Sequence, residues 1–420
     1  MAKSVRIRIE SMAFQGYGVS RIDGKVVFIP YSGIGDEGWV DIVEEKKNYS
    51  RGKWVEILVP SPCRVEPLCR YFGTCGGCQW QHIDYAKQVK LKEEILEDHL
   101  MRLGKLKELP SVAAFPSSDP YDYRIRVQFK VDGGKLGYYR DRSHQLIDVE
   151  RCPIAHPLVN QIIALLRENR SLLSPAQGID IDVSPEEGKG ALIFHPLNTS
   201  REMETSARHC LESYPILKGI TISSNRQSVS LGNPPLSFTL PFHLTLCTSP
   251  GSFFQVNLKQ NERLVQKVIE FSRPQKNESA LDLYSGVGNF ALPLATLTQE
   301  VWGIEENAIA VKDACFNAQL NGIENVGFIQ GRVEDILKRW EKDKPDLVIL
   351  DPPRKGCREA VDQVTELKPG RIVYISCEPT IFARDLRLFS AKGYFLRELA
   401  LIDMFPQTYH MEVVGLLQEG

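Results

Sequence analysis

The sequence Leu281-Asp282-Leu283-Tyr284-Ser285-Gly286-Val287-Gly288-Asn289 places a short apolar segment directly before a glycine-rich loop. Apolar segments of strand length recur downstream at residues 301–304, 326–329, 347–350 and 372–375, and helical patterns separate them. Such alternation is typical of a doubly wound, mostly parallel sheet with helices on both faces. The sequence therefore predicts an α/β domain over residues 251–420.

In sheets of this kind, ligands bind beyond the carboxyl ends of the strands. Gly286 lets the loop backbone approach a ligand, and Glu305 ends the next strand, where a carboxylate can accept hydrogen bonds from two ribose hydroxyl groups. The loop also fits the G-x-G-x-x-A pattern, so an NAD-dependent dehydrogenase is an alternative. Asp282 favours a methyltransferase, because a carboxylate would repel a pyrophosphate but attract the sulfonium and amino groups of S-adenosylmethionine (SAM).

Two further segments follow predicted strands. Asp351 begins Asp-Pro-Pro-Arg, in which the prolines end regular strand pairing and fix the carboxylate. Cys377 ends the strand near 372–375, and Glu412 lies further along the chain. A thiolate that adds to carbon 6 of a pyrimidine makes carbon 5 nucleophilic toward a methyl donor, and a base then removes the proton from carbon 5. We therefore expect Cys377 to be the nucleophile and Glu412 the general base of a pyrimidine methyltransferase.

Four other cysteines are candidates for metal ligands. Cys69, Cys75 and Cys78 are spaced C-x5-C-x2-C, and Cys152 precedes a proline, as cysteines at many cluster sites do. The three-plus-one layout favours an iron-sulfur cluster over four-cysteine zinc, whose sites usually consist of paired short knuckles. The remaining cysteines are expected to be inert and buried, namely Cys63, Cys210, Cys247, Cys315 and Cys357.

The N-terminal part of the chain has a different pattern. Short alternating runs at 5–9, 25–29, 39–43 and 53–59, separated by glycine turns, predict a small β-barrel over residues 1–60. Residues 61–250 are expected to form an α+β central domain. Its clearest elements are a charged helix over 79–103, which could pack on the catalytic domain, and a strand over 124–131.

Length and charge set further bounds. A chain of 420 residues is too long for one compact core, and a net charge of −2 neither demands nor excludes a nucleic-acid partner. The N-terminus alternates charged and apolar residues, and no stretch approaches membrane-spanning length. We therefore expect a cytoplasmic monomer that does not contact a membrane. In such a protein, ten cysteines indicate catalysis or metal ligation for some and burial for the rest.

From end to end, the chain resembles the RumA/RlmD-type family of RNA 5-methyluridine (uracil-C5) methyltransferases. The barrel, with residues 16–19 and 23–30, looks like the OB-like TRAM domain that such enzymes use to bind RNA. Residues 253–257 match the family segment Phe-x-Gln-x-Asn. The resemblance implies a Rossmann-like class I SAM-dependent methyltransferase domain. It also implies a central domain whose [4Fe-4S] cluster is held by Cys69, Cys75, Cys78 and Cys152.

The same resemblance implies roles for single residues. Cys377 matches the family nucleophile and Glu412 its base. The expected SAM contacts are Gln255, Tyr284, Asn289, Glu305 and Asp351, with Asp282, Gly286 and Arg332 as further candidates. Arg332 stands where the family often has an uncharged polar residue.

The resemblance narrows the substrate to RNA. Barrel and cluster together favour 23S rRNA, and a uridine of the tRNA T-loop is the alternative. A non-catalytic RNA-binding or redox-sensing protein is a third hypothesis, but it requires a broken active site, and every expected catalytic position is intact. Arg124, Arg126 and Arg142 are candidates for phosphate contacts, although solvated strand charges explain them equally well.

Overall fold

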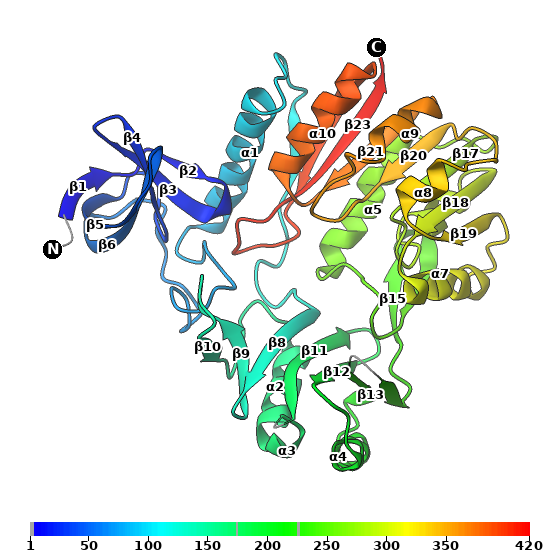
Figure 1. Ribbon diagram of the computed structural model, residues 1–420, viewed down its shortest axis with the longest axis horizontal. Helices are drawn as coiled ribbons and strands as arrows, with labels where there is room; N and C mark the ends of the chain where they lie inside the picture. Colours follow the sequence, from blue (N-terminus) through cyan, green and yellow to red (C-terminus); the bar gives the residue numbers. More distant parts are fainter. Residues whose placement is uncertain (1–3, 174, 225–226) are drawn as a thin grey trace.

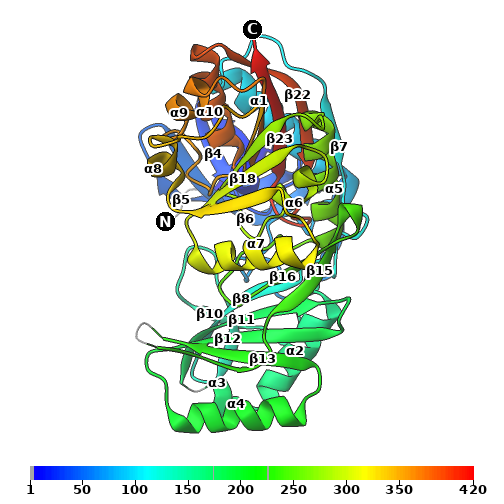
Figure 2. The same ribbon diagram turned by 90° about the vertical axis from the view of Figure 1, so that its right-hand side faces the viewer.

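The computed structural model of the protein describes residues 4–173, 175–224 and 227–420. Figure 1 shows an N-terminal sheet on the left, a central sheet below and a C-terminal sheet at the upper right. Figure 2 shows the central sheet beneath the C-terminal sheet from a second direction. Within the described part of the chain, no helix is long and apolar enough to cross a membrane.

The N-terminal sheet has six strands in the order β1-β5-β6-β4-β3-β2. They are β1 (Ser4–Arg8), β2 (Ser11–Ala13), β3 (Tyr17–Ile22), β4 (Lys25–Ile29), β5 (Glu37–Glu45) and β6 (Tyr49–Val59), and a short 3₁₀ helix η1 (Phe14–Gly16) precedes β3. The four predicted runs fall on β1, β4, β5 and β6. The prediction of glycine turns between these runs is wrong at Gly18, which lies inside β3, where a Cβ atom would come within 2.4 Å of the Ser32 Cβ atom.

A connector leads from β6 to helix α1 (Tyr85–Arg102), which begins later than predicted because Asp84 caps it. The Asp84 carboxylate accepts hydrogen bonds from the first-turn N–H groups of Ala86 and Lys87. Helix α1 lies between the N-terminal sheet and helix α10 (Pro379–Ala391) (Figure 1). Strand β7 (Val112–Phe115) then pairs with β22 (Tyr394–Ile402). The chain thus contributes to the C-terminal sheet before it enters the central one.

The central sheet has seven strands in the order β10-β9-β8-β11-β12-β13-β14. Its elements are β8 (Arg126–Asp132), β9 (Lys135–Tyr139), β10 (Leu146–Asp148), α2 (Pro157–Glu168), α3 (Arg170–Leu173), β11 (Ala176–Ser184), β12 (Lys189–Pro196), α4 (Arg201–Ser213), β13 (Leu217–Ser223) and β14 (Ser228–Gly232). The hairpin β15 (Leu236–Leu240) and β16 (Leu244–Thr248), with η2 (Pro241–His243) at its turn, leads to the C-terminal sheet.

The C-terminal sheet has eight strands in the order β19-β18-β17-β20-β21-β23-β22-β7. Its further elements are α5 (Leu258–Ser272), β17 (Ser279–Leu283), α6 (Ala291–Ala295), β18 (Glu300–Glu305), α7 (Ala308–Leu320), β19 (Val326–Gln330), α8 (Val333–Leu337), β20 (Leu347–Leu350), α9 (Val361–Glu366), β21 (Arg371–Ser376) and β23 (Glu412–Glu419). The five predicted strands are confirmed and are parallel, whereas β23 is antiparallel to both its neighbours. The strand order reverses between β17 and β20, where such sheets bind ligands.

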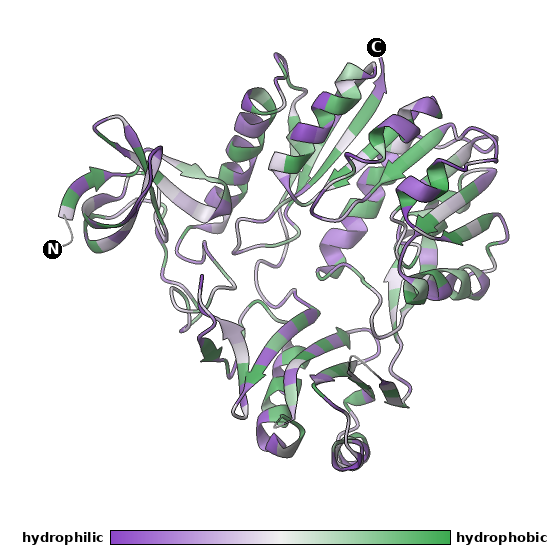
Figure 3. Cartoon of the chain, in the orientation of Figure 1, coloured by the Kyte–Doolittle hydropathy of each residue, from purple (hydrophilic) through white to green (hydrophobic). Residues whose placement is uncertain are grey.

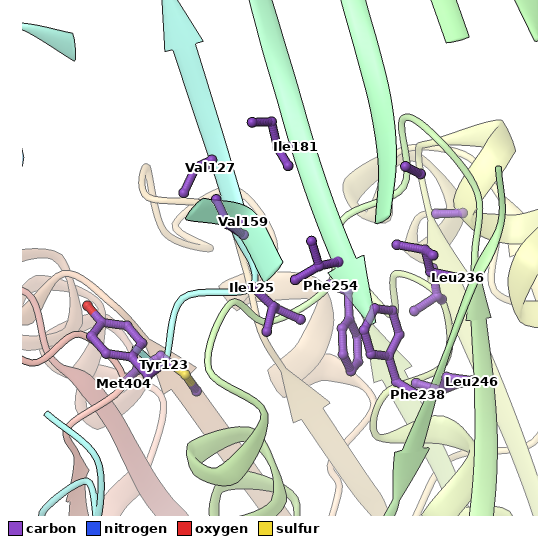
Figure 4. Close-up of a cluster of buried hydrophobic side chains, with 14 of the residues drawn as sticks. Tyr123, Ile125, Val127, Val159, Ile181, Leu236, Phe238, Leu246, Phe254 and Met404 are labelled. Atoms are coloured by element: carbon purple, nitrogen blue, oxygen red, sulfur yellow. The ribbon is translucent and has the colours of Figure 1, made fainter. Parts of the chain in front are cut away.

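One hydrophobic core joins the central and C-terminal sheets. Figure 4 shows Ile125 and Ile181 beside Phe238, Leu246 and Phe254, the last of which precedes α5. The rings of Phe238 and Phe254 stack with centroids 4.7 Å apart. Figure 3 shows hydrophobic residues along the strands of the C-terminal sheet, whereas helices such as α1 carry both hydrophobic and hydrophilic residues. Packing in this core holds residues 253–257, the predicted cofactor segment, against the sheet ends.

Candidate active site

The glycine-rich loop leaves β17 at the carboxyl edge of the sheet. Gly286 and Gly288 have φ angles of 53° and 94°, in the left-handed region where a side chain would be strained. A Cβ atom at Gly286 would meet nothing within 4 Å, so the backbone there faces open space. This part of the loop is therefore open to a ligand.

Asp282 lies fully buried at the end of β17. Neither of its carboxylate oxygens has a hydrogen-bond partner among the residues that the structure describes. Burial raises the pKa of this carboxyl group well above its usual range, and the nearby charge of Asp351 raises it further. A buried acceptor of this kind calls for a donor or a cation from a ligand.

Glu305, at the end of β18, connects this strand to the loop that follows β17. Its carboxylate accepts hydrogen bonds from the N–H groups of Gly286 at 3.0 Å and Asn307 at 2.7 Å. These contacts hold the partly exposed side chain beside the glycine loop. Oxygen atoms with remaining lone pairs are thus fixed at the position where the sequence predicts a ribose.

Two predicted cofactor contacts bond to the protein itself. Asn289 exchanges two side-chain hydrogen bonds, of 2.9 and 3.0 Å, with Asn261 of α5, and so ties the loop to that helix. Tyr284 donates its hydroxyl proton to Glu334 at 3.1 Å. Sequence reasoning missed Glu334, a buried residue of α8. Burial, followed by the charge of Glu334, raises the pKa of Tyr284.

Arg332 caps α8 with its backbone, and its side chain is about half exposed. The guanidinium group lies 3.2 Å from the Glu359 carboxylate and 3.7 Å from that of Glu334. Two carboxylates at the edge of the site therefore balance the positive charge of Arg332.

Asp351 and Gln255 approach the same edge from different segments. Asp351 follows β20, and burial raises the pKa of its carboxyl group to about 7, with a further contribution from Glu305. Gln255 is buried in the segment before α5. The next residue, Val256, accepts a hydrogen bond from the N–H group of Ile125, which anchors this segment to the central domain.

Cys377 and Glu412 lie at the ends of neighbouring strands. In the antiparallel pair β21 and β23, Ser376 pairs with Val413, so the register places Cys377 opposite Glu412. Burial, followed by the charge of Glu412, raises the pKa of the Cys377 thiol to about 12. Glu412 is buried, and burial followed by the charge of Asp351 raises its pKa as well. The thiol is partly exposed, so a substrate can reach it.

Arg354 is the cation that acts on this pair. Its charge lowers the pKa values of Cys377 and Glu412, against the effect of burial. The side chain forms no ion pair with any described residue. Burial and then Arg354 also lower the pKa of His410 to about 3, which keeps that imidazole neutral. Arg354 belongs to the Asp-Pro-Pro-Arg motif, but its effect on Cys377 and Glu412 depends on how the strand ends come together, which the motif does not specify.

The four predicted cluster ligands meet around one cavity of about 240 Å³, which Cys69, Cys75, Cys78 and Cys152 line together with Arg124, Arg151 and Arg354. Burial raises the pKa of the Cys75 thiol to about 11. The Gly77 N–H group donates to the Cys75 Sγ atom at 3.4 Å. Among the described residues, no three Cys, His, Asp or Glu side chains are close enough together to hold a single metal ion.

The remaining cysteines are only partly as predicted. Cys210 and Cys357 are buried, whereas Cys63 and Cys247 are partly buried. The prediction for Cys315 is wrong, because this residue is exposed on α7. A lone cysteine on a helix carries no pattern that reveals which way it faces.

The three arginines proposed for phosphate contacts lie in different surroundings. Arg126 donates to the Ser252 carbonyl at 2.7 Å and lies 3.2 Å from Asp182, so it is used within the protein. Arg124 lines the cavity of the four thiols. Arg142 is exposed beside the N-terminal sheet, where it contacts the Tyr17 hydroxyl group.

Comparison with known proteins agrees with this geometry. A tRNA (uracil-5-)-methyltransferase family profile matches residues 84–419, and a TRAM domain profile matches residues 3–55. An uncharacterized RNA methyltransferase of Aquifex aeolicus is 36% identical, with 99% of both chains covered. The 23S rRNA (uracil(1939)-C(5))-methyltransferase RlmD of Pectobacterium atrosepticum is 33% identical, with 99% of this chain and 94% of that protein covered.

A solved structure extends the likeness to the fold. The tRNA (uracil-54, C5)-methyltransferase of Pyrococcus abyssi, in complex with S-adenosyl-L-homocysteine, superposes with a TM-score of 0.77 at 25% identity. The match covers 98% of this chain and 100% of that one. These findings argue against the dehydrogenase alternative. The chain belongs to the tRNA (uracil-5-)-methyltransferase family and is a uracil-C5 RNA methyltransferase.

Proposed function

We propose that the chain methylates carbon 5 of a uridine in 23S rRNA through a transient bond between Cys377 and carbon 6 of the base. The observation that supports the proposal is the register of β21 and β23, which continues beyond Ser376 and Val413 to bring residue 377 beside residue 412. A nucleophile and a base on one side of a ring are what the replacement of a C5 hydrogen by methyl requires.

The residues divide the chemistry between them. The Cys377 thiolate adds to carbon 6, and the C5–C6 electron pair makes carbon 5 nucleophilic. SAM, when bound, supplies an electrophilic methyl group for that carbon. The Glu412 carboxylate then takes the proton from carbon 5, and departure of Cys377 restores the double bond. Because burial keeps the free thiol protonated, Arg354 assists the first step by favouring the thiolate.

The polar groups around the glycine loop support a SAM site. Asp282 provides buried acceptor oxygens, which match the charged amino group of the methionine part. Glu305, already fixed by two backbone N–H groups, provides oxygens for ribose hydroxyl groups. We propose Gln255, Tyr284 and Asp351 as further contacts.

The choice of 23S rRNA over tRNA rests on sequence. The rRNA enzyme of Pectobacterium atrosepticum is 33% identical to this chain, and the tRNA enzyme of Pyrococcus abyssi is 25% identical. The latter match covers 98% of this chain, so an N-terminal barrel does not by itself separate the two substrates. A T-loop uridine in tRNA is therefore the second candidate.

Methyl transfer to defined RNAs tests the proposal. Purified enzyme with methyl-labelled SAM is expected to form 5-methyluridine in unmodified 23S rRNA and to leave unmodified tRNA unlabelled. Cys377→Ala should abolish turnover and the covalent adduct with 5-fluorouridine RNA while SAM still binds. The exposed Cys315→Ala variant is the matched control and should retain activity. Labelling of tRNA alone would overturn the rRNA assignment, and an active Cys377→Ala enzyme would overturn the thiolate mechanism.

A [4Fe-4S] cluster at Cys69, Cys75, Cys78 and Cys152 is the second part of the proposal. The four thiols line one cavity, and a backbone N–H···S hydrogen bond reaches one of them, as is common at iron-sulfur ligands. The donors therefore fit the group, which would join the connector before α1 to the central domain.

Iron analysis tests this part separately. Protein purified without oxygen should contain about four irons per chain. Cys75→Ala should lose them, and Cys63→Ala, which changes a connector thiol outside the cavity, should keep them. Stoichiometric zinc in the wild-type protein would refute the cluster.

A further inference from the structure

A further pocket lies between the N-terminal sheet and the central domain. Its volume is about 250 Å³, and its walls include Tyr17, Tyr31, Gln79, Asp141, Arg142 and Tyr409. These residues come from β3, the loop after β4, the connector, the loop after β9, and the segment before β23. We call it the interdomain pocket.

Aromatic rings make up much of the wall. Tyr17, Tyr31 and Tyr409 all line the pocket, and the Arg142 guanidinium lies 5.2 Å from the centroid of the Tyr17 ring. Aromatic faces and stacked arginines are the surfaces on which proteins hold unpaired nucleobases. A base is therefore a better fit than a sugar or a phosphate group.

The charged groups of the pocket wall are the Asp141 carboxylate and the Arg142 guanidinium, which lie 4.0 Å apart. The Asp141 side chain is half exposed, so its oxygens can accept hydrogen bonds from a ligand. A ligand here must supply donors, and the carboxylate disfavours a phosphate.

Guanine has the donors that this wall needs. Its N1–H and N2 amino groups point from one edge, whereas adenine and the pyrimidines present an acceptor there or fewer donors. We infer that the interdomain pocket binds an unpaired guanine of the RNA substrate, with the two Asp141 oxygens accepting from N1–H and the N2 amino group of its Watson–Crick edge and tyrosine rings stacking on its face. This inference deepens the proposed function and rests on RNA being the substrate.

The pocket is connected to the catalytic groups through Tyr409. The Tyr409 ring packs edge-on against Phe14 of the N-terminal domain at 5.2 Å and lies 4.1 Å from the His410 ring. Glu412 follows three residues after Tyr409. A guanine seated against Tyr409 would therefore order the segment that leads to the proposed base.

Binding measurements test the inference without requiring methyl transfer. The probes are fluorescent uridine heptamers that carry one guanine, adenine or hypoxanthine at each position in turn, with dissociation constants measured by anisotropy. At one position, guanine should bind about tenfold more tightly than adenine. Hypoxanthine, which lacks the N2 amino group, should lie between them.

Variants assign the preference to the pocket. Asp141→Ala and Asp141→Asn should each bring the guanine-to-adenine ratio close to one, and Gln145→Met, in the same hairpin loop but outside the pocket, should leave it unchanged. Asp141→Asn keeps the size of the side chain, so a lost preference in that variant does not reflect a collapsed pocket.

The inference is wrong if no position prefers guanine, or if the preference survives in both pocket variants. Methyl transfer without a guanine preference would support the proposed function and reject the guanine site. A guanine preference without methyl transfer would support the guanine site and reject the proposed function.

Discussion

Replacing Lys92 with methionine should destabilise the protein by about 3–5 kcal/mol. Lys92 and Asp403 are both fully buried, and the Lys92 Nζ atom lies 2.6 Å from the Asp403 Oδ1 atom. Methionine fills most of the volume of lysine, so the main cost is the unpaired carboxylate that stays behind. Removal of one partner of a buried pair costs about 3–5 kcal/mol.

The damage should extend to the segment before Glu412. Asp403 also accepts a hydrogen bond from the Tyr85 hydroxyl group at 2.8 Å, and Lys92 donates to the Phe405 carbonyl at 3.2 Å. These contacts attach α1 to the chain that leads into β23. We therefore expect Lys92→Met to lower kcat as well, because the proposed base is held less firmly.

Urea unfolding followed by tryptophan fluorescence measures the loss. The Lys90→Met variant is the control, because Lys90 forms an exposed pair with Glu93 at 2.9 Å on the same helix and should change stability by less than about 1 kcal/mol. The double variant Lys92→Met with Asp403→Leu should recover most of the stability, since neither charge is left unpaired. A loss below about 1 kcal/mol for Lys92→Met, or a double variant as unstable as the single one, would refute the reasoning.

Three further predictions concern the site and the barrel. Glu412→Gln should permit methyl addition but trap the adduct, seen as RNA that remains bound in denaturing gels; normal release would exclude Glu412 as the base. Arg354→Gln should raise the pKa of Cys377 and slow alkylation of this thiol about tenfold per pKa unit at pH 8–9, where the thiolate is the minor form. Arg358→Gln is the control, and equal alkylation rates in the two variants would contradict a role for Arg354. Gly16→Ala should lower the thermal midpoint, because Gly16 has a φ of 84° and a Cβ atom would lie 2.9 Å from that of Gln79; an unchanged midpoint would count against this close contact.

The central parallel strands β17, β20 and β21 were predictable because each is buried on both faces. Continuous apolar runs such as Leu347–Leu350 therefore identify them locally. Strands β7, β22 and β23 were not predicted. Their place depends on pairing between distant segments, since Val112 of β7 pairs with Leu399 of β22. Local sequence holds no information about a partner so far along the chain.

In the candidate site, too, some residue positions could be predicted from local sequence and others could not. Residues that end predicted strands, such as Asp282 and Asp351, could be placed at the carboxyl edge because the edge is common to all parallel strands. The partners of Tyr284 and Asn289 could not, because Glu334 and Asn261 reach them from helices whose packing the sequence does not specify. The buried pair of Lys92 and Asp403 was missed for a related reason, since an amphipathic pattern assigns lysine to the solvated face.

Residues 403–411, which lead to Glu412, contact several parts of the protein. Gln407 exchanges hydrogen bonds with Gln88 of α1, and Tyr409 packs on Phe14 of the N-terminal domain. His410 lines the cavity of the four cysteines. The segment that ends at Glu412 thus contacts the barrel, the connecting helix and the proposed cluster site, and its position depends on all three. Loss of any one contact should therefore affect catalysis more strongly than SAM binding, because Asp282 and Glu305 are held by the sheet and the glycine loop instead.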